Sequence, residues 1–207
     1  MVGLGYVGLP LAVGFAAHFE VIGYDRSKER IAELKRGVDR THGVEEGALE
    51  RSELRFTSDP QDLRSCTFVV VAVPTPITKA REPDLSPLES ASAAVGRILQ
   101  PGMLVVYEST VFPGVTEDVC LPTLEKESGL KLGEFALGYS PERINPGDTE
   151  HRVSDTVKVV SGHDAAALKR VADTYGGGIS DDKSSTAYTK NKAESSEGQG
   201  EGTARAD

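Results

Sequence analysis

A glycine-rich loop at the start of the chain constrains its fold more than any other feature. Residues 1–8 read MVGLGYVG, which contains the spacing GxGxxG. Glycines at these positions allow a tight turn, close approach of the backbone to a pyrophosphate, and close packing of the next helix on a sheet. A buried strand normally precedes such a loop, but only Met1 and Val2 do so here. The loop therefore predicts a dinucleotide-binding unit whose central first strand is truncated.

The segment after the loop supplies the second half of the pattern. Residues 7–18 form an apolar, helix-compatible run, and residues 20–25 read EVIGYD, a short buried strand that ends in Asp25. Asp25 follows Gly3 at nearly the spacing, about 20 residues, at which an acid binds the adenosine ribose. A carboxylate favours NAD, because it would repel a 2′-phosphate. The alternative is a glycine-rich turn followed by an unrelated aspartate.

The rest of the first 175 residues alternates between strand-like and helix-like runs. Short strand-like runs occur at 54–57, 66–73, 103–108, 134–139 and 157–160. The run FVVVAV at 68–73 has the continuous β-branched composition of a strand buried on both faces. Helix-compatible runs predict helices at 27–37 with Ser27 as N-cap, at 86–100 with Ser86 as N-cap, at 115–126 and at 164–175. The acidic segment 41–51 is interpreted as a loop. This alternation predicts an α/β fold with a Rossmann-like, doubly wound parallel sheet. Ser109 and Thr110 follow one of these strands, at the carboxyl end, where ligands of such sheets bind.

Composition narrows the classes of partner. The 207 residues carry a net charge of −9, which argues against nucleic acid or an anionic membrane as the main partner. No signal sequence and no membrane-spanning run is recognisable, so we expect a cytoplasmic protein. Neither the four histidines nor Cys66 and Cys120 have metal-ligand spacing, and we expect no metal site. Both cysteines are interpreted as small buried apolar residues.

Composition changes abruptly after residue 175. Residues 176–207 contain almost no large apolar side chain, so they cannot bury enough surface to order themselves. We therefore predict two parts, an NAD-binding Rossmann-like domain at 1–175 and a disordered C-terminal tail at 176–207. The tail is either a flexible segment or out-of-frame sequence, and the second interpretation is favoured because the tail carries no repeat or motif.

Five motifs occur in order along the first 150 residues: GLGYVGLPLAVGFA, VVVAVPTP, PDLSPLESA, YESTVFPGVTE and YSPERINPGD. Together they resemble the UDP-glucose/GDP-mannose dehydrogenase family, and the resemblance covers residues 1 to about 175. SPERINPGD, followed by His151 and Arg152, and the PDLSPL segment are most similar to the branch that oxidises UDP-N-acetylhexosamines.

This resemblance implies an activity. Members of the family use two NAD molecules to oxidise the 6-hydroxyl of a nucleotide sugar to an aldehyde and then, through a cysteine thioester, to a carboxylate, in polysaccharide precursor synthesis. A UDP-sugar would be the substrate of the intact protein, and family members form homo-oligomers.

The resemblance also implies roles for individual residues. The loop residues Gly3, Gly5, Tyr6, Val7 and Gly8 would cradle the pyrophosphate, Asp25 would hold the ribose, and Thr75, Ser109 and Thr110 would line the cofactor cleft. Thr110 would also position a water molecule, and Glu142 would act as general base in thioester hydrolysis. The alternative for Glu142 is a solvated loop side chain or an ion pair with Arg143.

The sequence departs from the family in one functional respect. The nucleophilic cysteine in a Gly-rich segment, and the lysine and asparagine of the helix before it, have no counterparts here, so we expect the chain to be inactive alone. The helix that forms the usual oligomer interface would begin where the tail departs, so that interface is expected to be missing. Two alternatives remain: a non-catalytic nucleotide-binding module, and a hydroxy-acid dehydrogenase of the 6-phosphogluconate type, against which YSPERINPGD and YESTVFPG argue.

Overall fold

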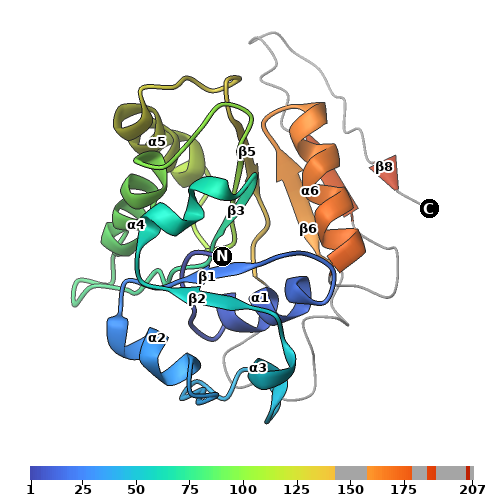
Figure 1. The fold of residues 1–207 in the computed structure, drawn as a ribbon. Helices are drawn as coiled ribbons and strands as arrows, with labels where there is room; N and C mark the ends of the chain where they lie inside the picture. Colours follow the sequence, from blue (N-terminus) through green and yellow to red (C-terminus); the bar gives the residue numbers. More distant parts are fainter. Residues whose placement is uncertain (143–157, 179–185, 190–203, 206–207) are drawn as a thin grey trace, which may run out of the picture.

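The computed structural model describes residues 1–142, 158–178, 186–189 and 204–205 (Figure 1). The helices are α1 (Gly8–Ala16), α2 (Lys28–Leu34), α3 (Ala48–Arg51), α4 (Ser86–Gly96), α5 (Leu121–Ser128) and α6 (Ala165–Gly178), with a 3₁₀ helix at Pro60–Ser65 and a π-helical turn at Thr116–Cys120. The strands are β1 (Ile22–Tyr24), β2 (Arg55–Thr57), β3 (Phe68–Val71), β4 (Leu104–Tyr107), β5 (Ala136–Tyr139), β6 (Val159–Gly162), β7 (Thr186–Thr189) and β8 (Ala204–Arg205).

The start of the chain joins two parts of one sheet. Strands β2 and β1 pair in parallel, and β3, β4 and β5 pair in parallel, while Val2 forms single parallel bridges to Tyr24 on one side and Val71 on the other. The Val2 N–H donates to the Val70 carbonyl at 2.7 Å, and the Tyr24 N–H donates to the Met1 carbonyl at 2.8 Å. The order is thus β2, β1, Val2, β3, β4, β5, β6, with Val2 at the centre between β1 and β3.

Helices cover both faces of this sheet, which is the doubly wound arrangement (Figure 1). On one face, α1 and α6 pack on β3 and β4 through residues that include Leu11, Phe15 and Val171. On the other face, α4 and α5 pack through residues that include Leu88 and Leu124. All four residues of β4 are buried, because a strand covered on both faces has no solvent side.

Two strand pairs are antiparallel within the doubly wound parallel sheet that the sequence predicts. Strand β6 pairs antiparallel with β5, with Gly138 opposite Gly162. Its burial alternates between buried and partly exposed residues, unlike that of β4, and an antiparallel strand beside a parallel sheet is a common arrangement. Strands β7 and β8 continue the sheet from β6, parallel and then antiparallel.

Two local predictions also differ from the structure. Ser86 is the first residue of α4 and caps nothing with its side chain; its N–H donates to Asp84 Oδ1 at 2.9 Å. The side chain that bonds to the backbone at this point is that of Asp84, two residues before the expected cap. The capping pattern therefore misleads. The segment 41–51, expected to be a loop, contains α3.

The predicted boundary at residue 175 falls inside α6, and β7 and β8 lie within the predicted tail. Most of the SPERINPGD loop, His151 and Arg152, and the rest of the tail lie outside the described residues, so the domain limits stay a prediction. None of the helices in the described ranges is long and apolar enough to cross a membrane.

Candidate cofactor site

The three glycines of the loop occupy three different environments. Gly3 has a φ of +89°, in the left-handed region, and a Cβ there would lie 2.8 Å from the Ala72 carbonyl oxygen. A Cβ on Gly8, the first residue of α1, would overlap the Gly3 carbonyl oxygen, so only glycine lets the helix pack this closely. At Gly5, by contrast, a Cβ would meet none of the described atoms within 4 Å. The loop is therefore tight at both ends and open in the middle.

Asp25 holds the loop from the end of β1. Its Oδ2 accepts the Leu4 N–H at 3.0 Å, and its Oδ1 accepts the Ser27 N–H at 2.9 Å. Ser27 in turn caps α2 by accepting the Arg30 N–H at 3.2 Å. The carboxylate thus lies at the carboxyl end of β1 beside the glycine loop, where a ribose next to the pyrophosphate would be bound.

A buried arginine that the sequence analysis did not predict donates a hydrogen bond to the backbone of the loop. Arg30 is only 3% exposed; its Nε donates to the Leu4 carbonyl at 2.9 Å, and its Nη2 donates to Asp39 Oδ1 at 2.7 Å. Burial alone would raise the pKa of Asp39, but hydrogen bonds from Thr41 and Arg30 outweigh it and lower the pKa. Both charges of the pair are thereby retained beneath the loop.

The predicted residues at the ends of β3 and β4 lie together. Ser109 Oγ donates to the Val73 carbonyl at 2.6 Å, and Thr75 Oγ1 donates to the Thr110 carbonyl at 2.9 Å. Thr110 Oγ1 donates to the Glu142 carbonyl at 3.2 Å, which ties the segment after β5 to the segment after β4. Gly3 packs against residues 72 and 73, so the loop borders the same edge of the sheet. Tyr6 is 49% exposed beside it.

A buried cluster of charges lies under this edge. Lys158 Nζ donates to Glu108 Oε2 and to Glu142 Oε2, both at 2.9 Å, and all three side chains are at most 7% exposed. Burial alone would lower the pKa of Lys158, but the two carboxylates outweigh it and raise the pKa, so the ammonium is retained. Glu142 is therefore not a solvated loop side chain; Arg143, its other suggested partner, lies outside the described residues. The one sequence signal for Lys158 is a charged residue within the apolar run VKVV.

Neither cysteine presents an exposed thiol at this edge. Cys120 is fully buried in the core, and burial raises the pKa of its thiol to about 11. Cys66 is half-buried near the amino end of β3, and burial raises the pKa of its thiol also. No group of three potential metal ligands occurs within the described part of the chain.

The parallel sheet order, the GxGxxG loop opening α1 and the acid ending β1 together define a dinucleotide-binding domain of the Rossmann type. Residues 1–176 match the NAD-binding domain of the UDP-glucose/GDP-mannose dehydrogenase family. The chain belongs to this family, and NAD is its cofactor, which confirms the resemblance carried by the five motifs.

Several known proteins are similar to the chain. The UDP-N-acetyl-D-glucosamine 6-dehydrogenase of Pseudomonas aeruginosa is 53% identical over 177 residues, and the protein CapL of Staphylococcus aureus is 52% identical over 176; each alignment covers 84% of this chain and 42% of the relative. The solved NDP-N-acetyl-D-galactosaminuronic acid dehydrogenase of Methanosarcina mazei is 36% identical, with a TM-score of 0.78 over 86% of this chain and 41% of that one. The chain thus spans about two fifths of the length of the relatives it matches.

Proposed function

We propose that this chain is the NAD-binding part of a nucleotide-sugar 6-dehydrogenase that converts a UDP-N-acetylhexosamine to the uronic acid in polysaccharide precursor synthesis. The observation that carries the proposal is the 53% identity to a UDP-N-acetyl-D-glucosamine 6-dehydrogenase over 177 residues. It is joined to a glycine loop that is closely packed at Gly3 and Gly8 and open at Gly5. Five motifs in the family's order support the same conclusion.

The open centre of the glycine loop fits the pyrophosphate of NAD. Because no Cβ fills the space over Gly5, backbone N–H groups at the start of α1 can reach a phosphate, and the helix N-terminus favours its negative charge. Asp25 would accept hydrogen bonds from the ribose hydroxyls. The far end of the cleft would be lined by Thr75, Ser109 and Thr110. The chemistry that NAD supplies when bound is acceptance of a hydride from the sugar C6.

Thr110 and Glu142 are proposed as the catalytic residues of the intact enzyme. The hydrogen bond from the Thr110 hydroxyl to the Glu142 backbone fixes one relative to the other, next to the carboxyl end of β4. The Lys158 ammonium holds the Glu142 carboxylate in place through a 2.9 Å hydrogen bond. In this arrangement Glu142 would accept a proton from the water that hydrolyses the thioester.

We further propose that the isolated chain binds NAD without turning over sugar. Of its two cysteines, Cys120 is buried in the core and Cys66 lies near the amino end of β3. A thioester needs a thiolate at the carboxyl edge, beside the nicotinamide. On this basis the non-catalytic nucleotide-binding module is the second candidate function for the 207-residue polypeptide itself.

Calorimetric titration of the folded chain with NAD tests the binding. Gly5→Ala adds a methyl group into the open centre of the loop, so we expect at least a tenfold loss of NAD affinity with little change in thermal stability. Gly176→Ala is the matched control, because its Cβ also meets nothing within 4 Å but lies in α6, and its affinity is expected to be unchanged. A folded chain that does not bind NAD, or a Gly5→Ala variant that binds normally, refutes the site. Formation of NADH from NAD on addition of UDP-N-acetylglucosamine would contradict the proposal that the isolated chain does not turn over sugar.

A further inference from the structure

Leu4, between the first two glycines of the loop, is fixed through its side chain and through both of its backbone polar groups. Its side chain is fully buried, and a Cβ on Gly23 of β1 would lie 3.0 Å from its Cδ2 atom. Its N–H donates to Asp25 Oδ2 at 3.0 Å, and its carbonyl accepts the Arg30 Nε–H at 2.9 Å. The two peptide groups that flank Leu4 are therefore tied to the end of β1 and to α2.

The hydrogen bond from Arg30 also decides where the Gly5 N–H points. None of the peptide bonds in the described part of the chain is cis, and the C=O and N–H of a trans peptide point in opposite directions. The Leu4 carbonyl is directed inward, to an arginine that is only 3% exposed. The Gly5 N–H belongs to the same peptide and is therefore directed outward. Gly5 itself is partly exposed, and a Cβ on it would meet no described atom within 4 Å.

The neighbouring peptides of the loop are fixed by backbone hydrogen bonds. The Gly3 N–H donates to the Tyr24 carbonyl at 2.9 Å, and the Gly5 carbonyl accepts the Leu9 N–H at 3.0 Å in the turn that opens α1. Among all these contacts of the loop, that of Arg30 is the one in which a side chain donates. The direction of the peptide between Leu4 and Gly5 thus depends on this side chain.

The other end of the guanidinium is anchored by Asp39. Arg30 Nη2 donates to Asp39 Oδ1 at 2.7 Å, and the two side chains are 4% and 7% exposed. Asp39 is itself fixed, because its Oδ1 accepts the Thr41 N–H at 3.0 Å and its Oδ2 accepts the Gly43 N–H at 2.8 Å. A planar guanidinium that is held at one edge presents its Nε–H in one direction, whereas a flexible ammonium does not.

Arg30 acts on the loop through the direction of this hydrogen bond and not through its charge. Its guanidinium lies 2.7 Å from a carboxylate oxygen of Asp39 and 3.8 Å from one of Glu33. One guanidinium beside two carboxylates supplies no net positive charge that would attract a phosphate. What reaches a phosphate from this part of the chain is instead a directed backbone N–H, the group by which helix N-termini bind anions.

We propose that Arg30 is a positioning residue for NAD: it turns the peptide between Leu4 and Gly5 so that the Gly5 N–H donates to an oxygen of the pyrophosphate. The proposal rests on the cofactor site proposed above. The Arg30 side chain lies buried behind the loop and does not touch the cofactor. Because the N–H is oriented before the cofactor arrives, binding does not have to turn this peptide, and the affinity is higher by that saving.

Titration of the 207-residue chain and of its Arg30→Lys variant with NAD, ADP and adenosine tests this role. Lysine keeps a positive charge beside Asp39 but lacks the fork that reaches both Asp39 and the Leu4 carbonyl. We expect NAD and ADP to bind the variant about tenfold more weakly, the effect of one hydrogen bond to a charged group. Adenosine has no phosphate, so its affinity should be unchanged, whereas a general loosening of the domain would weaken all three ligands.

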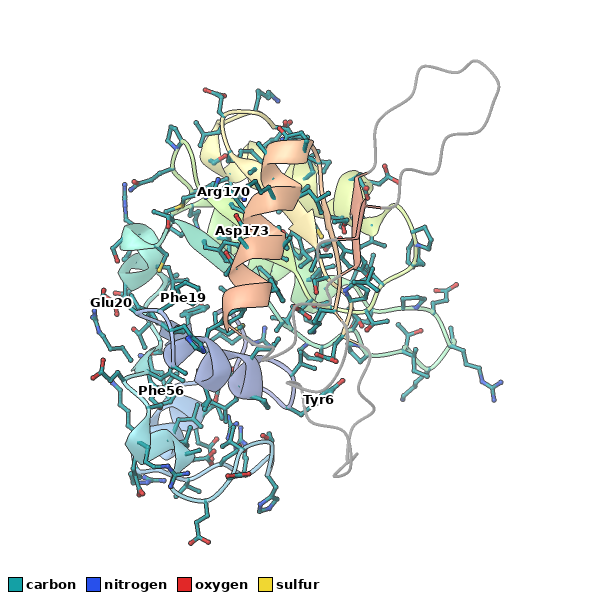
Figure 2. The ribbon with its side chains drawn as sticks, turned by 90° about the vertical axis from the view of Figure 1, so that its right-hand side faces the viewer. Tyr6, Phe19, Glu20, Phe56, Arg170 and Asp173 are labelled. Atoms are coloured by element: carbon teal, nitrogen blue, oxygen red, sulfur yellow. The ribbon has the colours of Figure 1, made fainter. Side chains whose placement is uncertain are left out.

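Arg170→Lys is the matched control. Arg170 donates to the Gly102 carbonyl at 3.1 Å and to the Thr67 carbonyl at 3.3 Å, so this change also removes an arginine that bridges two backbone segments. Figure 2 shows Arg170 on α6, well apart from Tyr6 of the glycine loop. We expect Arg170→Lys to bind NAD with the affinity of the unmodified chain.

Nuclear magnetic resonance observes the peptide directly and does not depend on the folding of a variant. The Gly5 amide proton of the unmodified chain should move downfield when NAD is added, because its N–H gains a charged acceptor. A Gly5 amide that does not respond to bound NAD would overturn the proposal. So would an Arg30→Lys variant that binds NAD and ADP normally, or one that loses adenosine affinity to the same extent; both outcomes leave the cofactor site itself standing. An unmodified chain that does not bind NAD would overturn the site, and the role of Arg30 with it.

Discussion

The buried amino group of Met1 should make the stability of this polypeptide depend on pH between about 6 and 8. Met1 is only 7% exposed, and burial lowers the pKa of its amino group from 8.0 to about 6 in the folded chain. The unfolded chain keeps the ordinary value. Between these two values the unfolded state binds more protons than the folded state, so the free energy of unfolding rises with pH across this window.

The size of the effect follows from the shift. Lowering the pKa from 8.0 to about 6 corresponds to about 3 kcal/mol. Below pH 6 the ammonium is charged in both states, and the folded chain carries the full cost of burying it; above pH 8 both states are neutral and the cost is gone. This is a large fraction of the roughly 5–15 kcal/mol by which domains are stable.

Urea denaturation at pH 5.5, 7.0 and 8.5 measures this dependence. The matched control is the same chain with an acetylated N-terminus, which has no amino group to titrate, and intact mass confirms that Met1 is retained in both. The difference between the two chains isolates the amino group from all other titrating residues. A free-amine chain with the same pH dependence as the acetylated chain, or one that loses stability from pH 6 to 8, would refute the reasoning.

Two substitutions test the packing around the site. Gly8→Ala should lower the free energy of unfolding by more than about 2 kcal/mol, because its Cβ would overlap the loop backbone, and chemical denaturation measures this loss. Lys158→Met should lower the free energy of unfolding by about 3–5 kcal/mol, because it leaves the fully buried Glu108 carboxylate without the Lys158 ammonium. Lys169→Met, which breaks an exposed i,i+4 pair with Asp173, should change stability by less than about 0.5 kcal/mol and is the control in the same assay; equal effects of the two lysine variants would contradict the role of burial.

Local patterns were sufficient for most of the fold. The apolar runs FVVV and LVVY have one stable environment, a strand covered on both faces. The first forms β3 and the second forms β4. Ser27 was the expected helix cap and is observed as one. Where two polar residues competed locally, the pattern misled: Asp84 takes the backbone hydrogen bond at the start of α4, and Ser86 is displaced into the helix.

The candidate site was predictable to the extent that its residues lie in contiguous motifs. The glycine loop, Asp25 and the residues after β3 and β4 follow from strand ends and spacing. The ion pairs beneath them do not, since Lys158 is 50 positions from Glu108 and 16 from Glu142, and no periodicity links residues so far apart. The direction of β6 was missed for a related reason, because strand polarity depends on tertiary pairing and leaves little trace in a four-residue run.

The hydrogen bonds of the first three residues show how the glycine loop is held at the carboxyl edge of the sheet. Val2 is bridged to Tyr24 of β1 and to Val71 of β3. The Val2 N–H donates to the Val70 carbonyl, and the Gly3 N–H donates to the Tyr24 carbonyl. The backbone groups that join β1 to β3 therefore also fix the start of the loop. A substitution that separates these two strands would displace the loop together with them.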